Sequence, residues 1–207
     1  LLRSQTALTY MLALMVGPGT LSGDLADGAL PLYLSRPITR VEYLLGKSAL
    51  LVAVLSCATW LPALVLLGLQ ATLEGSAWLL DNLRLVWATV AAFWVWIATL
   101  TLLVLAVSAW VRRRLVARIA LLGMYAVPAA FGAAVNEALS TDWGSLLSIP
   151  AVLRVVWRSL YGLGPRPGEF AADGPPVWAA WLALVLVAAA CVITLHARLR
   201  AFQVVSA

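Results

Sequence analysis

The sequence contains few charged residues and a single histidine. Charged side chains make up 11% of its 207 residues, whereas soluble domains carry about 25%. Hydrophobic side chains make up 63%, and the mean hydropathy is +0.97. A soluble core of this size has no room for so much apolar surface, so the values exclude an ordinary soluble domain and indicate a membrane protein. The single histidine, His196, argues against a two-histidine haem or a histidine-rich metal site.

Cysteine and catalytic motifs are equally scarce. Cys57 and Cys191 both fall inside apolar runs, where a thiol behaves as a small hydrophobe, so no disulfide framework is expected. The sequence has no Gly-rich phosphate loop of the Gly-x-x-x-x-Gly-Lys-Ser/Thr type and no paired carboxylates or Cys/His cluster on its apolar segments. We therefore expect no enzyme activity, no metal and no cofactor in this chain. The net charge of +5 comes from basic residues scattered at the ends of apolar segments, which argues against nucleic-acid binding.

Five apolar segments approach or exceed the roughly 20 residues that a helix needs to cross the hydrocarbon. They are residues 6–21, 48–69, 85–111, 115–135 and 177–195. The sequence thus predicts an all-α, polytopic membrane helix bundle that forms a single transmembrane domain over residues 1–207. The first segment is short and is interrupted by Gly-Pro-Gly at residues 17–19, so it must tilt or extend past that break. Pro62 predicts a kink in the second segment.

The distribution of basic residues orients these spans, because Lys and Arg near a span resist translocation. With the connections on alternating sides, one side receives nine basic and three acidic residues, and the other receives five and six. The nine are Arg36, Arg40, Lys47, Arg112, Arg113, Arg114, Arg118, Arg198 and Arg200, and the five are Arg3, Arg84, Arg154, Arg158 and Arg166. The prediction places residues 23–47 and the C-terminus in the cytoplasm and Leu1 outside. Because the chain begins with Leu1 rather than Met, we expect an upstream piece carrying one more span.

Residues 23–47, which we call the coupling segment, are the most charged part of the chain. Asp27 is placed as an N-cap with Pro31 in the first turn, which predicts a short helix. The Arg36-Pro37 pair ends this helix, since a residue before proline is pushed out of the α region. A capping box from Thr39 to Glu42 then begins a helix that continues into the next span. The pattern predicts a short cytoplasmic helix, a rigid corner and a span.

The long external loop, residues 136–176, contains a second amphipathic element. Residues 145–161 carry apolar side chains at helical spacing, with Arg154 and Arg158 four residues apart. We favour a helix that lies in the outer membrane interface, with a helix lining an external mouth as the alternative. In the third span, Trp94 and Trp96 are two residues apart and are expected to lie on different faces, one toward lipid and one toward the bundle.

The stretch GDLADGALPLYLSRPITRVEYLLGK resembles the cytoplasmic segment of ABC-2-type transporter permeases. That segment has an acidic residue, a Gly-Thr-Leu-like triplet, an apolar run, a Pro-x-Ser/Thr-Arg corner and a Gly-Lys pair, in this order. The matching positions are Asp24, Asp27, Gly28, Leu30, Leu34, Ser35, Arg36, Pro37, Thr39, Arg40, Gly46 and Lys47.

The resemblance implies a fold with six spans, five of which are in this chain, and both ends in the cytoplasm. It implies a permease subunit of an ATP-driven exporter in the cell inner (plasma) membrane. Its expected partners are a separate ABC ATPase subunit that binds the ATP, a second permease half, identical or related, and membrane lipid. The residues expected to contact the ATPase are Asp24, Asp27, Gly28, Leu30, Tyr33, Leu34, Arg36, Pro37, Arg40 and Lys47.

Two alternatives stay open at this point. The short helix of the coupling segment could lie on lipid headgroups, with Arg36 and Arg40 touching phosphate. The whole chain could instead be a structural or assembly subunit of a larger membrane complex, without transport of its own.

Overall fold

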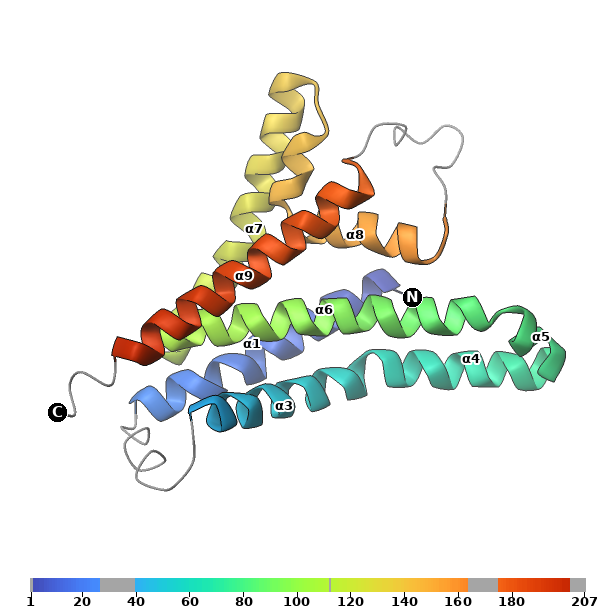
Figure 1. The fold of residues 1–207 in the computed structure, drawn as a ribbon, viewed down its shortest axis with the longest axis horizontal. Helices are drawn as coiled ribbons and strands as arrows, with labels where there is room; N and C mark the ends of the chain where they lie inside the picture. The colour runs from blue at the N-terminus through green and yellow to red at the C-terminus, as the bar shows by residue number, and fades with distance from the viewer. Residues whose placement is uncertain (1, 27–39, 112, 164–174, 202–207) are drawn as a thin grey trace. The chain divides into compact units, whose positions relative to one another are not determined.

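The structure is a computed structural model that describes residues 2–26, 40–111, 113–163 and 175–201. All of the regular structure in these ranges is helical, which confirms the predicted all-α class (Figure 1). The elements are α1 (Leu2–Ala26), α3 (Arg40–Ala58), α4 (Trp60–Glu74), α5 (Ser76–Asp81), α6 (Leu83–Trp110), α7 (Arg114–Leu139), the 3₁₀ helix η1 (Trp143–Leu147), α8 (Ile149–Leu160) and α9 (Val177–Ala201).

Four helical stretches are long and apolar enough to cross a membrane. They are Glu42–Glu74, Leu83–Trp110, Arg114–Leu139 and Val177–Arg198. These stretches contain or closely match four of the five predicted spans, which confirms a polytopic bundle. The remaining prediction, residues 6–21, falls within α1, which is a single helix of 25 residues but is not among the four. That α1 crosses the membrane stays a prediction.

The predicted break at residues 17–19 is wrong, because α1 continues without interruption through Pro18 to Ala26. Both Gly17 and Pro18 are buried. A Cβ atom at Gly17 would collide with the side chain of Val104 on α6. The glycine therefore allows a close helix contact, and packing outweighs the local preference of this triplet for a turn. As a result, the first four residues of the coupling segment continue α1 as helix.

A predicted irregularity occurs where α3 ends and α4 begins. The helix is interrupted at Thr59, three residues before Pro62. Pro62 has no N–H to donate to the carbonyl of Ala58, and its ring crowds that carbonyl. At the interruption, the N–H of Thr59 donates to the Ser56 carbonyl at 3.2 Å and its hydroxyl donates to the Leu55 carbonyl at 2.8 Å, so both donors of Thr59 keep a partner. The interruption agrees with the predicted kink.

The chain divides into two compact units. Unit 1 comprises Leu1–Thr59, Ile97–Leu122 and Val187–Ala207, and unit 2 comprises Trp60–Trp96 and Gly123–Leu186. Unit 1 has a core that includes Leu51, Leu55, Ile97, Leu100 and Val104, and unit 2 has a core that includes Phe93, Trp96 and Val156. The helices α6, α7 and α9 contribute residues to both units.

Candidate functional site

Most of the predicted coupling residues lie outside the described residues. Asp27, Gly28, Leu30, Tyr33, Leu34, Arg36 and Pro37 all belong to residues 27–39. Asp24 is part of α1, and Arg40 and Lys47 are part of α3. The short helix and the rigid corner therefore stay predictions. The described part of α3 starts at Arg40, with Glu42 in its first turn, which agrees with the expected capping box, but Thr39, the predicted N-cap, lies outside the described residues.

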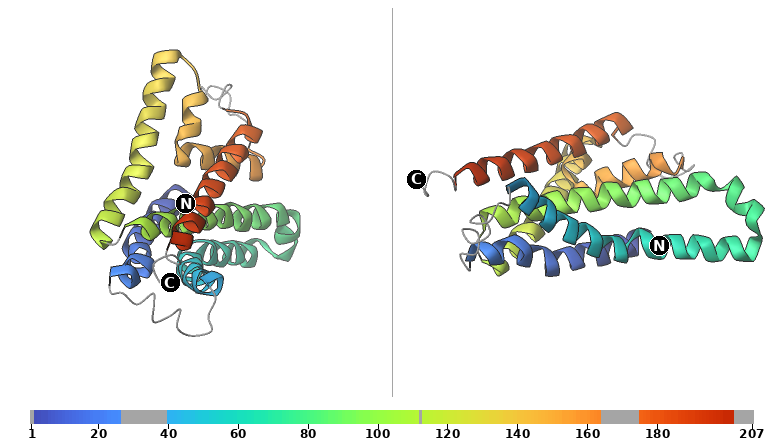
Figure 2. Two further views of the ribbon diagram at one scale, coloured as in Figure 1. Left: turned by 60° about the vertical axis from the view of Figure 1, so that its left-hand side comes forward. Right: turned by 60° about the horizontal axis from the view of Figure 1, so that its bottom comes forward.

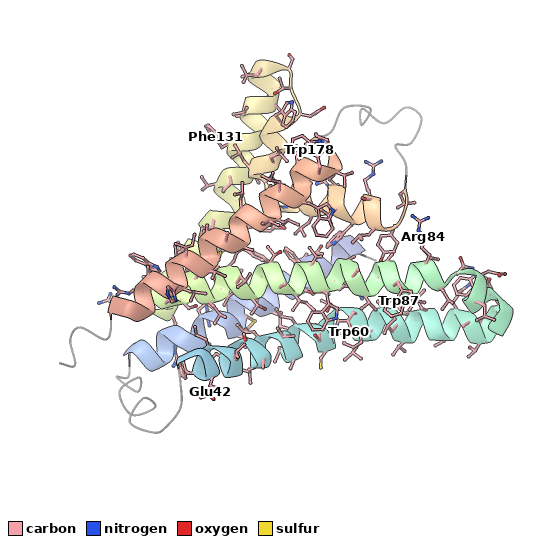
Figure 3. The ribbon with its side chains drawn as sticks, in the orientation of Figure 1. Glu42, Trp60, Arg84, Trp87, Phe131 and Trp178 are labelled. Carbon is pink, nitrogen blue, oxygen red and sulfur yellow. The ribbon has the colours of Figure 1, made fainter. Side chains whose placement is uncertain are left out.

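The coupling segment connects two helices that pack against each other. The helices α1 and α3 are in contact within unit 1, and Figure 1 shows them side by side, in blue and teal. At the start of α3, the Lys47 ammonium lies 5.7 Å from the centre of the Tyr43 ring, one helical turn away. Glu42 is exposed at the same end of α3 (Figure 3). The segment is thus anchored at both ends to one helix pair.

Two side chains tie α1 to α7 within unit 1. The hydroxyl of Tyr10 donates a hydrogen bond to the carbonyl of Leu121 at 2.9 Å. In the other direction, the guanidinium of Arg118 donates from Nε to the Leu14 carbonyl at 3.2 Å and from Nη2 to the Met15 carbonyl at 3.3 Å. Sequence reasoning treated Arg118 only as a charge that sets the orientation, and it did not single out Tyr10. A lone arginine within an apolar span was the available signal, because such a charge needs partners in the bundle.

Another basic residue joins the ends of two helices in unit 1. Arg198 on α9 donates from Nε to the Ala109 carbonyl at 3.4 Å. Its guanidinium carbon also lies 5.4 Å from the centre of the Trp110 ring. Ala109 is in the last turn of α6, where carbonyls lack helical partners, so Arg198 caps the C-terminus of α6.

Unit 2 contains an aromatic cluster in which α8 packs on the first half of α6 (Figure 2). The indole N–H of Trp157 donates to the Ala92 carbonyl at 3.0 Å. The ring of Trp157 also lies 6.5 Å from the rings of Phe93 and Trp96. Trp96 is 1% exposed, whereas Trp94 is 46% exposed, which confirms that the two lie on different faces of the helix.

The amphipathic helix predicted within residues 145–161 is present as α8, with η1 before it. Its apolar side chains Val152, Leu153 and Val156 are buried, so protein covers the apolar face. At its C-terminal end the hydroxyl of Tyr161 donates to the hydroxyl of Thr89 at 2.9 Å. Burial raises the pKa of Tyr161, and this hydrogen bond opposes the shift in part. The position of α8 relative to a membrane interface stays a prediction.

The end of α8 also lies beside a charged side chain of α6. Gly162 has a left-handed backbone, with φ of 65°, and the guanidinium of Arg84 lies directly against it (Figure 3). A cation at a helix C-terminus is favourable, because the last carbonyls carry partial negative charge. A side chain at Gly162 would displace this guanidinium and would be strained by the left-handed backbone. Within the described ranges, His, Cys, Asp and Glu side chains form no group of three or more that could hold a metal ion.

These observations describe a multi-pass, all-helical membrane protein in which a charged segment connects two packed helices. A protein-family model described as ABC-2 family transporter protein matches residues 6–203. The chain therefore belongs to the ABC-2 transporter family, and it is a permease subunit of an ABC transporter. No protein in the curated comparison matches it. Membership of the family implies an ABC ATPase as a partner.

Proposed function

We propose that this chain is the transmembrane subunit of an ATP-driven exporter, in which the coupling segment transmits the closure of a separate ATPase subunit to the spans. ATP is bound by the partner, and a second permease half, identical or related, completes the transporter. The complex resides in the cell inner (plasma) membrane. The observation that carries the proposal is the family match over residues 6–203, together with the anchoring of the segment between α1 and α3.

The charge distribution supports a cytoplasmic position for the coupling segment and for the C-terminus. Unit 1 holds ten of the 14 basic residues of the sequence, nine of them on the predicted cytoplasmic side and the tenth, Arg3, on the other, but only three of the nine acidic ones, whereas unit 2 holds four and six. Arg118, at the N-terminal end of α7, contacts α1, and Arg198, near the C-terminal end of α9, contacts the C-terminal end of α6, all within unit 1. These are the ends that the positive-inside rule assigns to the cytoplasm.

The packing of unit 1 suggests how a movement of the coupling segment would be transmitted to the helices. A force on the coupling segment acts on both α1 and α3, because these helices are in contact. The hydrogen bonds of Tyr10 and Arg118 pass the movement of α1 to α7. Rigid-body movement of packed helices is a common way in which transporters open and close a path. Two such segments, one from each permease half, would meet two ATPase subunits.

The test compares two triple variants of the tagged full chain, purified from cells with its ATPase. One variant replaces Leu30, Tyr33 and Leu34 by alanine, and the control replaces Leu61, Leu66 and Leu69, which are exposed on α4. In the first variant, we expect either the amount of copurifying ATPase or the cargo-stimulated ATPase activity to fall at least tenfold. The control should keep both. Equal recovery and equal stimulation across a panel of cargo compounds would refute the coupling role. Copurification of a larger assembly without any ATPase would favour the structural subunit.

A further inference from the structure

The hydrogen bonds of Arg118 fall on the two carbonyls that a proline disturbs most. In an α-helix the N–H of residue 18 would donate to the carbonyl of residue 14, but Pro18 has no N–H, and its ring crowds that carbonyl. The next bond in the ladder, from Gly19 to the carbonyl of Met15, is strained by the same crowding. Arg118 donates to the carbonyls of Leu14 and Met15.

From this coincidence we infer that Pro18 and Arg118 act as a matched pair, in which the arginine of α7 supplies the donors that the proline removes from α1. Proline is tolerated inside a membrane helix when a neighbouring helix satisfies the freed backbone groups. The planar guanidinium suits this task, since its donors point in fixed directions and reach two adjacent carbonyls at once. We call this arrangement the α1–α7 clamp.

Helix α1 is tightly packed around Pro18, so it must hold one well-defined position there. Pro18 is fully buried, and the neighbouring Gly17 lies against Val104 of α6. The hydroxyl of Tyr10, two turns before Pro18, bonds the carbonyl of Leu121 on the same face of α7. Helix α1 is thus held to α7 on the N-terminal side of Pro18, and the clamp fixes the position of α1 just before the proline.

The position of the clamp gives it a role in transport that rests on the proposed function. The residues of α1 after Pro18 lead directly into the coupling segment. Since a proline is the weakest point of a helical hydrogen-bond ladder, α1 would bend there when the segment is pushed. Arg118 is therefore a positioning residue: it holds the part of α1 before Pro18 to α7, so that movement reaching this part is passed on to α7.

The first experiment needs only the full chain and uses a double-mutant cycle. In a Cys57→Ala, Cys191→Ala background, spin labels are placed at Gly19→Cys and Leu122→Cys. A side chain at Gly19 meets no atom within 4 Å, and Leu122 is exposed. Arg118→Met, which removes every donor, is compared with Pro18→Ala and with the double variant. Arg114→Met is the matched control, since Arg114 is exposed one turn earlier on α7 and the structure shows no hydrogen bond from its side chain to any described residue.

We expect Arg118→Met to at least double the width of the label-to-label distance distribution and to lower the midpoint of thermal unfolding by roughly 4–8 °C. Pro18→Ala restores the N–H, so the double variant should return to the width and midpoint of Pro18→Ala alone. A loss of the same size in both proline and alanine backgrounds would overturn the inference, because Arg118 would then act through its charge. So would an Arg114→Met effect as large as that of Arg118→Met. If Arg118→Met does not accumulate, accumulation of the double variant supports the pair, and its failure overturns it.

The second experiment separates this inference from the proposed function. In the complex with the copurified ATPase, Arg118→Met should lower the cargo-stimulated part of the ATPase activity at least threefold and leave the basal rate unchanged. A clamp confirmed by the distance measurement, but without effect on stimulation, would contradict the transport role alone. A complex that contains no ATPase would count against the proposed function and would leave the clamp standing.

Discussion

Single residues in unit 1 decide how closely three helices approach. Gly17 allows α1 to pack against Val104, and the side chains of Tyr10 and Arg118 connect α1 to α7. Each is a small feature: a missing Cβ, one hydroxyl and one guanidinium. In a bilayer such features matter, because lipid tails are as apolar as leucine and helix association depends on close packing and hydrogen bonds.

Gly17→Leu should destabilise the chain by about 1–3 kcal/mol, the usual cost of forcing extra carbon atoms into a packed contact. The reason is the collision between a side chain at residue 17 and Val104. Gly19→Leu is the matched control, because a Cβ atom at Gly19 meets nothing within 4 Å. Thermal unfolding of both variants in detergent measures the difference. Equal midpoints would show that the contact with α6 is not tight.

Trp157→Phe should cost about 1 kcal/mol, the typical value of one hydrogen bond. The substitution removes the indole N–H that binds the Ala92 carbonyl and keeps an aromatic ring against Phe93 and Trp96. Trp178→Phe, at an exposed position of α9, serves as the control and should be neutral. The same unfolding assay checks the prediction. A neutral Trp157→Phe would mean that the ring contacts alone hold α8 on α6.

At the scale of the elements, the length of the apolar runs predicted the long helices well. Proline and glycine predicted where a helix is interrupted in only one of two cases. Four spans follow from apolar runs, because a helix is the way to satisfy the backbone in lipid. Pro62 behaved as expected, since the helix is interrupted at Thr59. Pro18 did not interrupt α1: Arg118 of α7 donates to the carbonyls that the proline leaves without helical partners, and Val104 of α6 packs against the neighbouring Gly17. Those partners lie some 90 to 100 residues away in the sequence, so no local pattern could reveal them.

The amphipathic helix α8 shows a similar limit. Its amphipathic pattern predicted the helix correctly, but the pattern alone does not say what covers the apolar face. In the structure Val152, Leu153 and Val156 are buried, and Trp157 contacts α6. Within the coupling segment, the sequence predicted the helix that the structure describes from Arg40, whereas residues 27–39, including the expected N-cap Thr39, stay predictions.

Pro62→Ala should join α3 and α4 into one continuous helix. The substitution provides an N–H for the carbonyl of Ala58 and removes the ring that crowds it. We expect amide hydrogen exchange at Thr59 and Trp60 to slow at least tenfold, since both amides then belong to an unbroken ladder. Pro128→Ala is the comparison, because Pro128 lies inside α7, which the structure shows as continuous. Unchanged exchange at residues 59 and 60 would mean that something other than Pro62 causes the interruption.

At the scale of the whole molecule, the sequence separates charge between the two units. Ten basic and three acidic residues belong to unit 1. This excess, together with the family, supports a permease whose coupling segment faces the cytoplasm. The sequence carries no comparable mark of the transported cargo.

The orientation predicts opposite labelling of two single-cysteine variants. In intact cells, a membrane-impermeant maleimide should label Glu169→Cys, in the external loop, at least tenfold more than Leu34→Cys, in the coupling segment. Both should label equally after the cells are opened. Stronger labelling of Leu34→Cys in intact cells would reverse the orientation and remove the basis for coupling to a cytoplasmic ATPase.

The most direct measurement is crosslinking between the coupling segment and the ATPase. A chain without Cys57 and Cys191 carries a single new cysteine at Tyr33, or at the exposed Trp87 on α6 as the control, and a short bifunctional thiol reagent is added to the copurified complex (Figure 3). We expect Tyr33→Cys to form a covalent adduct with the ATPase subunit in a yield that changes when ATP is added, and Trp87→Cys to form none. The absence of an adduct at Tyr33 and at every other position of residues 27–39, in a complex that contains the ATPase, would contradict the coupling role.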